Sequence, residues 1–368
     1  MALLPAMTSR ILILGAGLIG AGLAYELSCR GAGVTVIEAG LPASAASGRA
    51  FGWINASFSL SAAHFRARVA AMAGHRRWEA DLGYAGYLWQ GCLWWEQTGA
   101  AFDQMAKDLA QQAYPLVEIG RAEFAKLEPS LVRPPNRALL FSGEGAVDAA
   151  QLARHLLQAA SARGAKVLQG CPVAQILMSD GQVSGVRTAQ GIVLADQVIL
   201  ATGTGTPAML ADLGLRFPMQ TRPGAILRTH PISARIHHIL AGPEQELRQD
   251  KTGAILAPAP ASHQGHEGDT LANPEVLARE TLARLSDLLG TDLALQGLTL
   301  ADRPVPGDGL PAVGAVPGHD GLFMAVLHSG VTLAPIVAAS LADQVTGKGP
   351  SPEMAPFGPA RLLMRPGP

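Results

Sequence analysis

The chain opens with a pattern of apolar and polar positions that predicts a strand, a helix and a second strand. Residues 11–14 form a continuous apolar run, residues 18–30 carry apolar positions at helical spacing, and residues 34–37 are rich in β-branched side chains. A continuous apolar run is typical of a strand that is buried on both faces of a parallel sheet. Gly31 falls where a glycine often ends a helix. We therefore expect a βαβ unit at the start of the chain.

Similar elements return later in the chain. The pattern predicts a helix at 149–163 and strands at 166–168, 173–178, 183–188 and 197–200. The apolar stretch 321–342 approaches the length of a membrane span, but His328, Ser329, Gly330, Thr332 and Pro335 interrupt it. We expect a buried strand followed by a helix there, and no membrane span.

Two segments of different character, 76–146 and 217–300, separate these pieces. We expect an α/β fold of two interleaved domains. Residues 1–75, 147–216 and 301–348 form a Rossmann-like dinucleotide-binding domain, and residues 76–146 and 217–300 form a substrate domain with a mixed or antiparallel sheet. The end of the chain, 349–368, is rich in Pro and Gly and is predicted to be a surface tail.

Charge and cysteine content narrow the function. The 368 residues include 28 Lys and Arg against 29 Asp and Glu, so no strong field attracts nucleic acid or an anionic membrane. The three cysteines are odd in number and widely spaced, which indicates neither a disulfide framework nor a metal site. We therefore expect a cytoplasmic protein that acts on a small molecule, and the early residues show no export signal.

The first strand leads into a glycine motif. Gly15-Ala16-Gly17-Leu18-Ile19-Gly20 matches G-x-G-x-x-G between a strand and a helix, and Glu38 ends the next strand. In this context the glycines permit a tight turn, close approach to a pyrophosphate and close helix packing. Glu38 can accept hydrogen bonds from the hydroxyls of an unphosphorylated ribose. FAD and NAD share this fingerprint, so the motif alone leaves both open.

Three blocks resemble the superfamily of FAD-dependent oxidoreductases that includes D-amino acid oxidase, glycine oxidase and sarcosine oxidase. They are 15–38, the block 183–203 that ends Val-Ile-Leu-Ala-Thr-Gly, and the C-terminal region with Asp302-Arg303-Pro304, Asp308-Gly309-Leu310-Pro311 and 322–335. The order and spacing are also similar. The resemblance implies a two-domain flavoprotein, and it disfavours an enzyme that uses NAD alone.

The resemblance also assigns cofactor contacts. It implies that the ADP half of FAD lies against the glycine motif, Glu38, Ala39 and Val173, and that Ala201, Thr202 and Gly203 line the pyrophosphate. Ser47, Gly48, Arg49 and Ala50 would run beneath the flavin. Gly330, Val331 and Thr332 begin a helix whose amides can stabilise negative charge on the N1–C2=O edge of reduced flavin. With no Cys after Cys171 and no His between Glu38 and Phe51, we expect non-covalent FAD.

Arg303 is the main candidate for substrate binding. The resemblance implies that it grips a substrate carboxylate, for which a guanidinium has matching geometry. Leu300-Ala301-Asp302 departs from the usual residues before this Arg, and a structural ion pair is the alternative. Arg49 is either a second anion anchor or a phosphate neutraliser. His328 either reaches the flavin or substrate or is a hydrogen-bonded core histidine.

The expected reaction is oxidation of the C–N bond of a small amino acid or N-substituted amine to an imine, by hydride transfer to flavin N5. The cofactor supplies the difficult chemistry, so no catalytic side chain is named. A 2-hydroxy acid dehydrogenase, the flavin subunit of a multi-subunit dehydrogenase with an electron-acceptor partner, and a redox-inert flavin protein remain alternatives. The substrate, the acceptor and the oligomeric state stay open.

Overall fold

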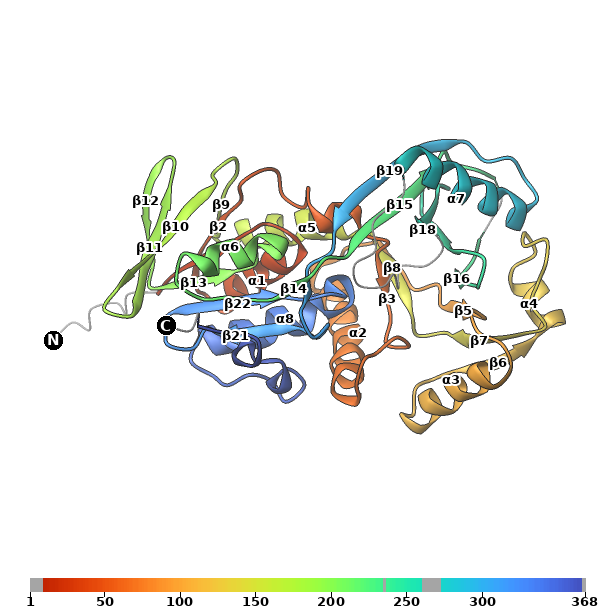
Figure 1. Ribbon diagram of the computed structural model, residues 1–368, viewed down its shortest axis with the longest axis horizontal. Coiled ribbons are helices and arrows are strands. Elements are labelled where there is room, and N and C mark those ends of the chain that lie inside the picture. The colour runs from red at the N-terminus through yellow and green to blue at the C-terminus, as the bar shows by residue number, and fades with distance from the viewer. Residues whose placement is uncertain (1–8, 234–235, 260–272, 366–368) are drawn as a thin grey trace.

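The strand expected at residues 11–14 lies inside a six-stranded sheet. The computed structural model describes residues 9–233, 236–259 and 273–365. In the sheet, β1 (Arg10–Leu14) pairs in parallel with β2 (Gly33–Ile37) and β13 (Gln197–Leu200). Outside them lie β9 (Lys166–Leu168), β22 (Leu322–Val326) and the antiparallel edge strand β21 (Ala312–Ala315), in the order β21-β22-β13-β1-β2-β9. Figure 1 shows this sheet toward one end of the long axis.

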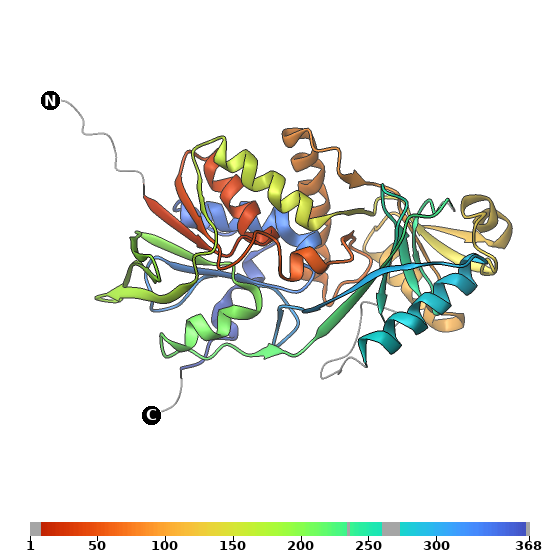
Figure 2. The same cartoon turned by 90° about the horizontal axis from the view of Figure 1, so that it is seen from above.

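The apolar run of β1 is explained by burial on both faces. Ile11 and Ile13 pack into a core with the helices α1 (Leu18–Cys29), α5 (Ala149–Ser161) and α8 (Gly330–Val345). Leu12 and Leu14 face the opposite core, toward the antiparallel sheet of β10 (Val173–Ser179), β11 (Gln182–Thr188) and β12 (Gly191–Leu194). Successive side chains of a strand point to opposite faces, so both must be apolar here. Figure 2 shows α1 and α5 side by side over the sheet.

Gly31 ends α1 as the sequence predicts. It has a φ of +77°, and the amides of Gly31 and Ala32 donate to the carbonyls of Ser28 and Leu27. This left-handed residue and its paired hydrogen bonds close a helix while satisfying its last carbonyls. The turn returns the chain into β2, which places Glu38 beside the start of α1.

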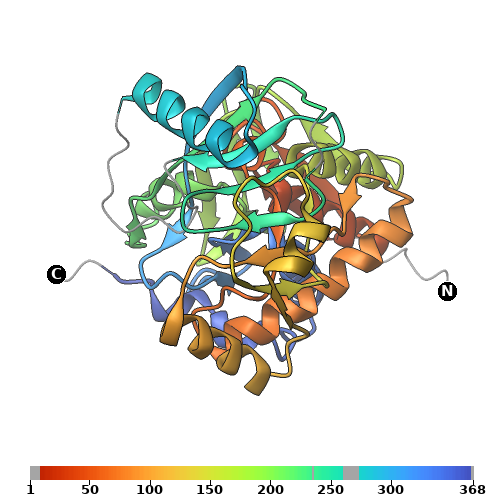
Figure 3. The ribbon, with the colours of Figure 1, turned by 90° about the vertical axis from the view of Figure 1, so that its right-hand side faces the viewer.

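A mixed eight-stranded sheet forms the other end of the molecule (Figure 3). Its order is β19 (Leu295–Asp302), β15 (Pro223–Thr229), β18 (Ile255–Ala259), β17 (Glu246–Gln249), β16 (Ile239–Ala241), β5 (Cys92–Trp94), β7 (Arg137–Phe141) and β6 (Val117–Gly120). The parallel pair β16–β5 joins strands from the two segments 76–146 and 217–300. The helices α3 (Gly99–Gln111), α4 (Arg121–Leu127) and α7 (Pro274–Leu289) accompany it. The α/β fold with parallel and antiparallel sheets agrees with the sequence-based expectation.

Smaller elements connect the two large sheets. The strands β3 (Trp53–Ile54), β8 (Gly145–Val147) and β4 (Tyr87–Leu88) form a three-stranded sheet, and β14 (Met219–Gln220) pairs with β20 (Val305–Pro306). The short helix α6 (Thr206–Ala211) follows β13. Among the described residues, no helix is long and apolar enough to cross a membrane.

The structure differs from two expected boundaries. Helix α2 (Ala62–Leu82) continues past residue 76, because Trp78 is fully buried in the core shared by α1 and α8. The segment expected as a surface tail is held against the sheet domain as far as a backbone bridge at Met364. Met354 and Phe357 are each 1% exposed in the same core, and Arg216 and Met364 form a backbone bridge. Met354 and Phe357 thus anchor this Pro- and Gly-rich segment on the surface of the sheet domain.

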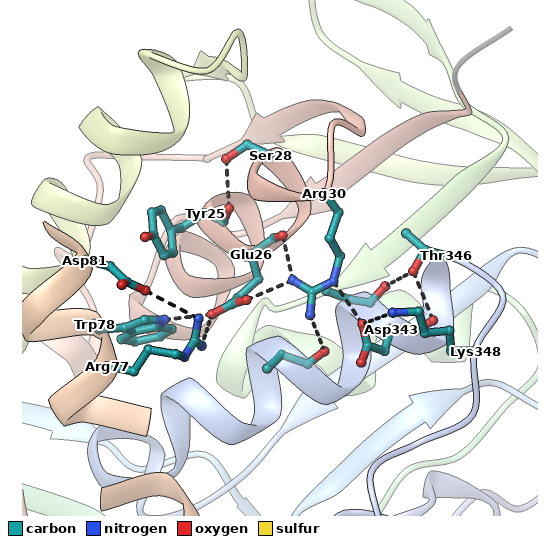
Figure 4. A network of polar contacts seen from close by, with 12 residues as sticks. Tyr25, Glu26, Ser28, Arg30, Arg77, Trp78, Asp81, Asp343, Thr346 and Lys348 are labelled. Carbon is teal, nitrogen blue, oxygen red and sulfur yellow. Dashed lines mark hydrogen bonds and ion pairs between the residues drawn. The ribbon is translucent and has the colours of Figure 1, made fainter. Parts of the chain in front are cut away.

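A buried carboxylate ties three helices together (Figure 4). Glu26 of α1 accepts hydrogen bonds from Arg30 at 2.8 Å, from Trp78 of α2 at 2.8 Å and from Arg77 of α2. Arg30 also donates to Asp343 of α8 at 2.9 Å. Burial alone raises the pKa of Glu26, but the hydrogen bonds from Arg30, Trp78 and Arg77 outweigh it and hold the pKa below its ordinary value.

Replacing Glu26 with Gln is expected to lower the free energy of unfolding by about 2–3 kcal/mol. Removing one member of a buried charge pair leaves its partners uncompensated, and partial exposure of both arginines reduces the cost below that of a fully buried pair. Because folding lowers the pKa of Glu26, its stabilisation is present above the unfolded pKa and is lost as pH falls through the folded one. Urea unfolding of both proteins at pH 7 and below pH 4 measures this difference.

The exposed pair Arg10–Asp196 provides the control for that measurement. Asp196→Asn is expected to cost less than about 1 kcal/mol, as surface ion pairs usually do. Equal effects of the two substitutions, or a Glu26→Gln effect that persists unchanged in acid, would show that the Glu26 carboxylate does not anchor the helices.

Candidate functional site

A cavity of about 1030 Å³ lies where the two large sheets meet, and most of the predicted site residues line it. This volume is at the upper end of the range for cofactor and ligand sites. The predicted residues on its wall are Gly15, Gly17, Leu18, Ile19, Glu38, Ala39, Ser47, Arg49, Ala50, Val173, Ala201, Thr202, Gly203, Arg303, His328, Gly330, Val331 and Thr332. Ala16, Gly20 and Gly48 are outside this wall. Gly48 lines a second, more open cavity that shares Arg49 with the first.

The glycine turn at the start of α1 is required by main-chain contacts. A Cβ on Gly15, which has a φ of +102°, would lie 2.5 Å from the carbonyl oxygen of Ala201. A Cβ on Gly20 would lie 1.9 Å from the carbonyl oxygen of Gly15. Neither distance is compatible with a side chain, so both positions need glycine. The close approach brings the N-terminus of α1 to the cavity.

Two other groups shape this end of the cavity. The Glu38 carboxylate accepts hydrogen bonds from the amide of Ala16 at 2.7 Å and from the amide of Gly40 at 2.8 Å. These bonds fix its orientation at the end of β2. The hydroxyl of Ser47 accepts a hydrogen bond from the amide of Leu18 at 3.0 Å, at the N-terminus of α1. The Ser47 hydroxyl proton is then available to an anion bound at this helix end.

The segment 51–55 forms the next part of the wall and is held rigidly. Gly52 has a φ of +83°, and a Cβ there would lie 2.1 Å from the carbonyl oxygen of Val147. The buried Arg248 donates from Nε to the carbonyl oxygen of Phe51 at 2.6 Å. Burial lowers the pKa of Arg248 to about 10, so it remains charged at neutral pH. The wall here is therefore fixed by main-chain geometry and by a buried cation.

The first turn of α8 is fixed by side chains from other elements. The Thr332 hydroxyl donates to the carbonyl oxygen of Trp53 at 3.2 Å and accepts from the amide of Asn55 at 3.3 Å. His75 of α2 lies with Nε2 2.8 Å from the carbonyl oxygen of Val331, and with Nδ1 3.0 Å from the Tyr87 hydroxyl. The carbonyl requires a donor, so the proton is assigned to Nε2. Burial lowers the pKa of His75 to about 4, which keeps the ring neutral.

Arg68 is a cavity residue that the sequence analysis missed. It lies on α2, is 5% exposed and lines the cavity. Its guanidinium donates to the carbonyl and side-chain oxygens of Asn55 and to the hydroxyl of Ser329, which precedes α8 with a φ of +58°. A positive φ at a serine is a strained conformation that needs support from its surroundings. Arg68 provides that support.

A second missed residue, Glu144, lies behind the cavity wall. Its carboxyl group is fully buried and accepts hydrogen bonds from Trp53 Nε1 at 2.9 Å, from the Tyr114 hydroxyl at 2.8 Å and from the Ser57 amide at 3.2 Å. Burial raises the pKa of Glu144 to about 7. Because Trp53 lines the cavity, Glu144 fixes the indole that forms part of its wall.

One pattern in the sequence points to Arg68 on α2. His64, Arg68, His75 and Trp78, with Ala71 between them, recur at intervals of four, three, four and three residues, and all five are buried. Such spacing marks one helix face. Polar side chains on a face with core spacing indicate a polar network, but the sequence does not name their partners.

The three predicted substrate residues occupy different surroundings. Arg303 follows β19, and its guanidinium contacts the carbonyl oxygens of Arg222 at 3.3 Å and Pro223 at 3.2 Å, which orient it. His328 is partly buried, with Nδ1 3.3 Å from the Ser329 hydroxyl. Arg49 is exposed and has no ion-pair partner among the described residues. The described part of the chain holds no cluster of His, Cys, Asp and Glu suited to a metal.

Comparisons with known proteins identify the family and the fold of this chain. The family model described as FAD dependent oxidoreductase (DAO) matches residues 10–344. The chain is 30% identical to the Bacillus subtilis protein named "Uncharacterized oxidoreductase YurR", over 96% of this chain and 99% of that one. It is 27% identical to a glycine oxidase of Pseudomonas aeruginosa, over 97% and 100%. The structure of L-amino acid deaminase from Proteus vulgaris has the same fold, with a TM-score of 0.87, 20% identity, and coverage of 98% of this chain and 95% of that one.

Gly15→Ala is expected to weaken FAD binding by about tenfold or more. The added Cβ strains the turn and collides with the carbonyl oxygen of Ala201, at a cost of about 1–3 kcal/mol. Relief of this collision moves the main chain at the start of α1 away from the main chain at Ala201. Titration of the apoprotein with FAD, followed by quenching of flavin fluorescence, measures the affinity.

Gly31→Ala is the matched control for this substitution. Gly31 also has a positive φ, +77°, but a Cβ there meets nothing within 4 Å. It should lower stability by about 1 kcal/mol and leave FAD affinity unchanged. If Gly31→Ala weakens FAD binding as much as Gly15→Ala does, general strain and not the Ala201 contact controls the cofactor.

Proposed function

Since this chain belongs to the DAO family of FAD-dependent oxidoreductases, we propose that it oxidises the C–N bond of a small amino acid or N-substituted amine to an imine. The observation that carries the proposal is the single cavity that joins the glycine turn, the start of α8 and Arg303. A dinucleotide-sized space and a carboxylate-binding group thus open into each other. The relatives named as glycine oxidases and amino acid deaminases support an amino acid substrate.

The residues of the cavity fit non-covalent FAD along its length. Main-chain contacts leave no room for a side chain at Gly15, the Glu38 carboxylate is preoriented beside the start of α1, and Ser47 stands at that helix end. We assign the ADP half to this region, near Val173, and the flavin to the region of 50–53 and 330–332. The free cysteines are Cys29, Cys92 and Cys171. Of these, Cys171 lines the cavity, and it lies two residues before Val173, in the region assigned to the ADP half and not to the flavin.

When bound, FAD would supply the redox chemistry as the acceptor of a hydride from the substrate. The protein's own share is to orient the substrate and exclude water. Arg303, steadied by the carbonyls of Arg222 and Pro223, binds the substrate carboxylate through two parallel hydrogen bonds. The amides at the start of α8 would favour negative charge on a flavin bound beside them. A substrate amine that arrives unprotonated needs no general base.

An anaerobic panel of substrates tests the proposal. D-amino acids, N-methyl amino acids, cyclic imino acids and 2-hydroxy acids are each mixed with the yellow holoenzyme, and bleaching of the flavin absorbance is recorded. We expect bleaching by a member of the first three classes. Bleaching only by a 2-hydroxy acid would show that the enzyme oxidises an alcohol group and not an amine. No bleaching by any compound would contradict the proposed activity.

Arg303→Leu is expected to retain FAD while kcat/KM for the carboxylate-bearing substrate falls about 30-fold to several thousandfold. Removing one partner of a buried charge pair costs about 2–5 kcal/mol, and about 1.4 kcal/mol corresponds to tenfold. Arg303→Lys should recover only part of the loss, because an ammonium group lacks the planar fork of a guanidinium. Steady-state kinetics with the bleaching substrate measures both variants.

Two controls accompany the Arg303 variants. Arg228→Leu removes a cation on the neighbouring strand β15 that pairs with Asp250 and lies outside the cavity, so it should leave kcat/KM unchanged. An amine without a carboxylate should be indifferent to Arg303→Leu. Loss of FAD or unfolding in Arg303→Leu would instead support the structural ion pair considered from the sequence, and normal turnover would exclude a carboxylate role.

A further inference from the structure

The charge of Arg68 has no directly bonded counter-ion among the residues that the structure describes. Of its five N–H donors, Nε points to His64 at 3.3 Å, two on Nη1 point to the oxygens of Asn55, and one on Nη2 points to Ser329. All these acceptors are neutral groups, because burial lowers the pKa of His64 to about 3. The remaining Nη2 hydrogen has no acceptor within the described part of the chain. Arg68 also lines the cavity.

A buried cation of this kind requires a compensating negative charge. Burial lowers the pKa of Arg68 only to about 10, so the side chain stays charged at neutral pH. The acid that acts on it electrostatically is Glu144, which is not hydrogen-bonded to it and is only partly ionised near pH 7. Removing a charge from water without pairing it is costly. A negative charge brought by a ligand into the cavity offsets that cost.

The surroundings of Arg68 indicate where that charge lies. Arg68 donates to Ser329, whose carbonyl accepts the first hydrogen bond of α8, and to Asn55, whose amide is bonded to Thr332. The guanidinium and the first turn of α8 therefore form one hydrogen-bonded block. The positive end of the helix and a full positive charge favour an anion at the same corner of the cavity.

We propose that Arg68 is the buried counter-charge for the negative charge that gathers on the N1–C2=O edge of the flavin on reduction. This inference rests on the placement of FAD proposed above. Arg68 thereby raises the reduction potential of the bound flavin, in concert with the start of α8. It differs from Arg303 in role, because it acts on the cofactor and not on the substrate.

Sulfite tests the proposal without any substrate. Its sulfur forms a bond to flavin N5, and the displaced electron pair is delocalised onto the N1–C2=O edge, so a positive charge nearby strengthens the adduct. The key variant is Asn55→Asp, which keeps the size and the oxygen acceptor of residue 55 but places a carboxylate against Nη1 of Arg68. This change gives the guanidinium an adjacent counter-charge and retains its hydrogen bonds. Arg68→Met removes the charge outright, and Arg68→Lys retains it.

In the holoenzyme, Asn55→Asp and Arg68→Met are expected to raise the sulfite dissociation constant by about tenfold or more and to lower the reduction potential of the flavin. Arg68→Lys should weaken sulfite binding less than either substitution, because it keeps the positive charge. Arg228→Leu, with the same change in net charge at a site outside the cavity, should match the wild type. If Arg68→Met fails to fold, Asn55→Asp and Arg68→Lys decide the question.

Two outcomes overturn the proposal. Unchanged sulfite affinity and reduction potential in FAD-loaded Asn55→Asp would limit Arg68 to holding Ser329 and Asn55. If Asn55→Asp or Arg68→Met keeps its sulfite affinity but no longer binds acetate, as detected by the flavin spectrum, Arg68 binds a substrate carboxylate instead. Neither measurement uses the substrate panel. Failure of this inference and failure of the proposed function are therefore detected by separate experiments.

Discussion

The cavity depends on main-chain segments that approach one another more closely than a side chain permits. The contacts of Gly15 with Ala201 and of Gly52 with Val147 join parts of the chain that are far apart in sequence, and the contact of Gly20 with Gly15 closes the turn at the start of α1. Each brings a strand end or a helix start to the cavity. Because these contacts are between backbone atoms, they fix positions more rigidly than side-chain packing does. The polar groups of the site are arranged around this framework.

Buried charges provide the second level of organisation. Arg248 and Arg68 hold the carbonyls of Phe51 and Asn55, at the two ends of the segment that runs along the cavity. Glu144 fixes the indole of Trp53 between them. Each of these groups is costly to bury, and each is held by hydrogen bonds to neutral atoms or to the main chain. The segment 51–55 therefore has little freedom to move without breaking several of these bonds.

The sequence predicted the parts of the site that depend on local patterns. The glycine turn, the strand ending at Glu38 and the start of α8 are contiguous motifs, and the structure brings their residues to one cavity. Arg68 and Glu144 were missed because their roles arise from tertiary contacts. Arg68 binds Ser329, 261 residues away, and Glu144 binds Trp53, 91 residues away, and Tyr114. The end of α2 and the packing of the C-terminal segment were missed for a related reason. Single buried side chains, Trp78 and Phe357, outweigh the local composition there.

The packed C-terminal segment contacts the loop that follows the cavity residue Arg303. Arg361 binds the Asp308 carboxylate at 2.8 Å and the carbonyl oxygens of Leu310 and Pro311 at 3.1 and 2.7 Å. These residues belong to the loop that follows Arg303 and leads into β21. A truncation that removes Arg361 would release that loop from its clasp. The residues around Arg361 thus brace the loop beside the cavity residue Arg303, so a change in this segment reaches the cavity through its wall.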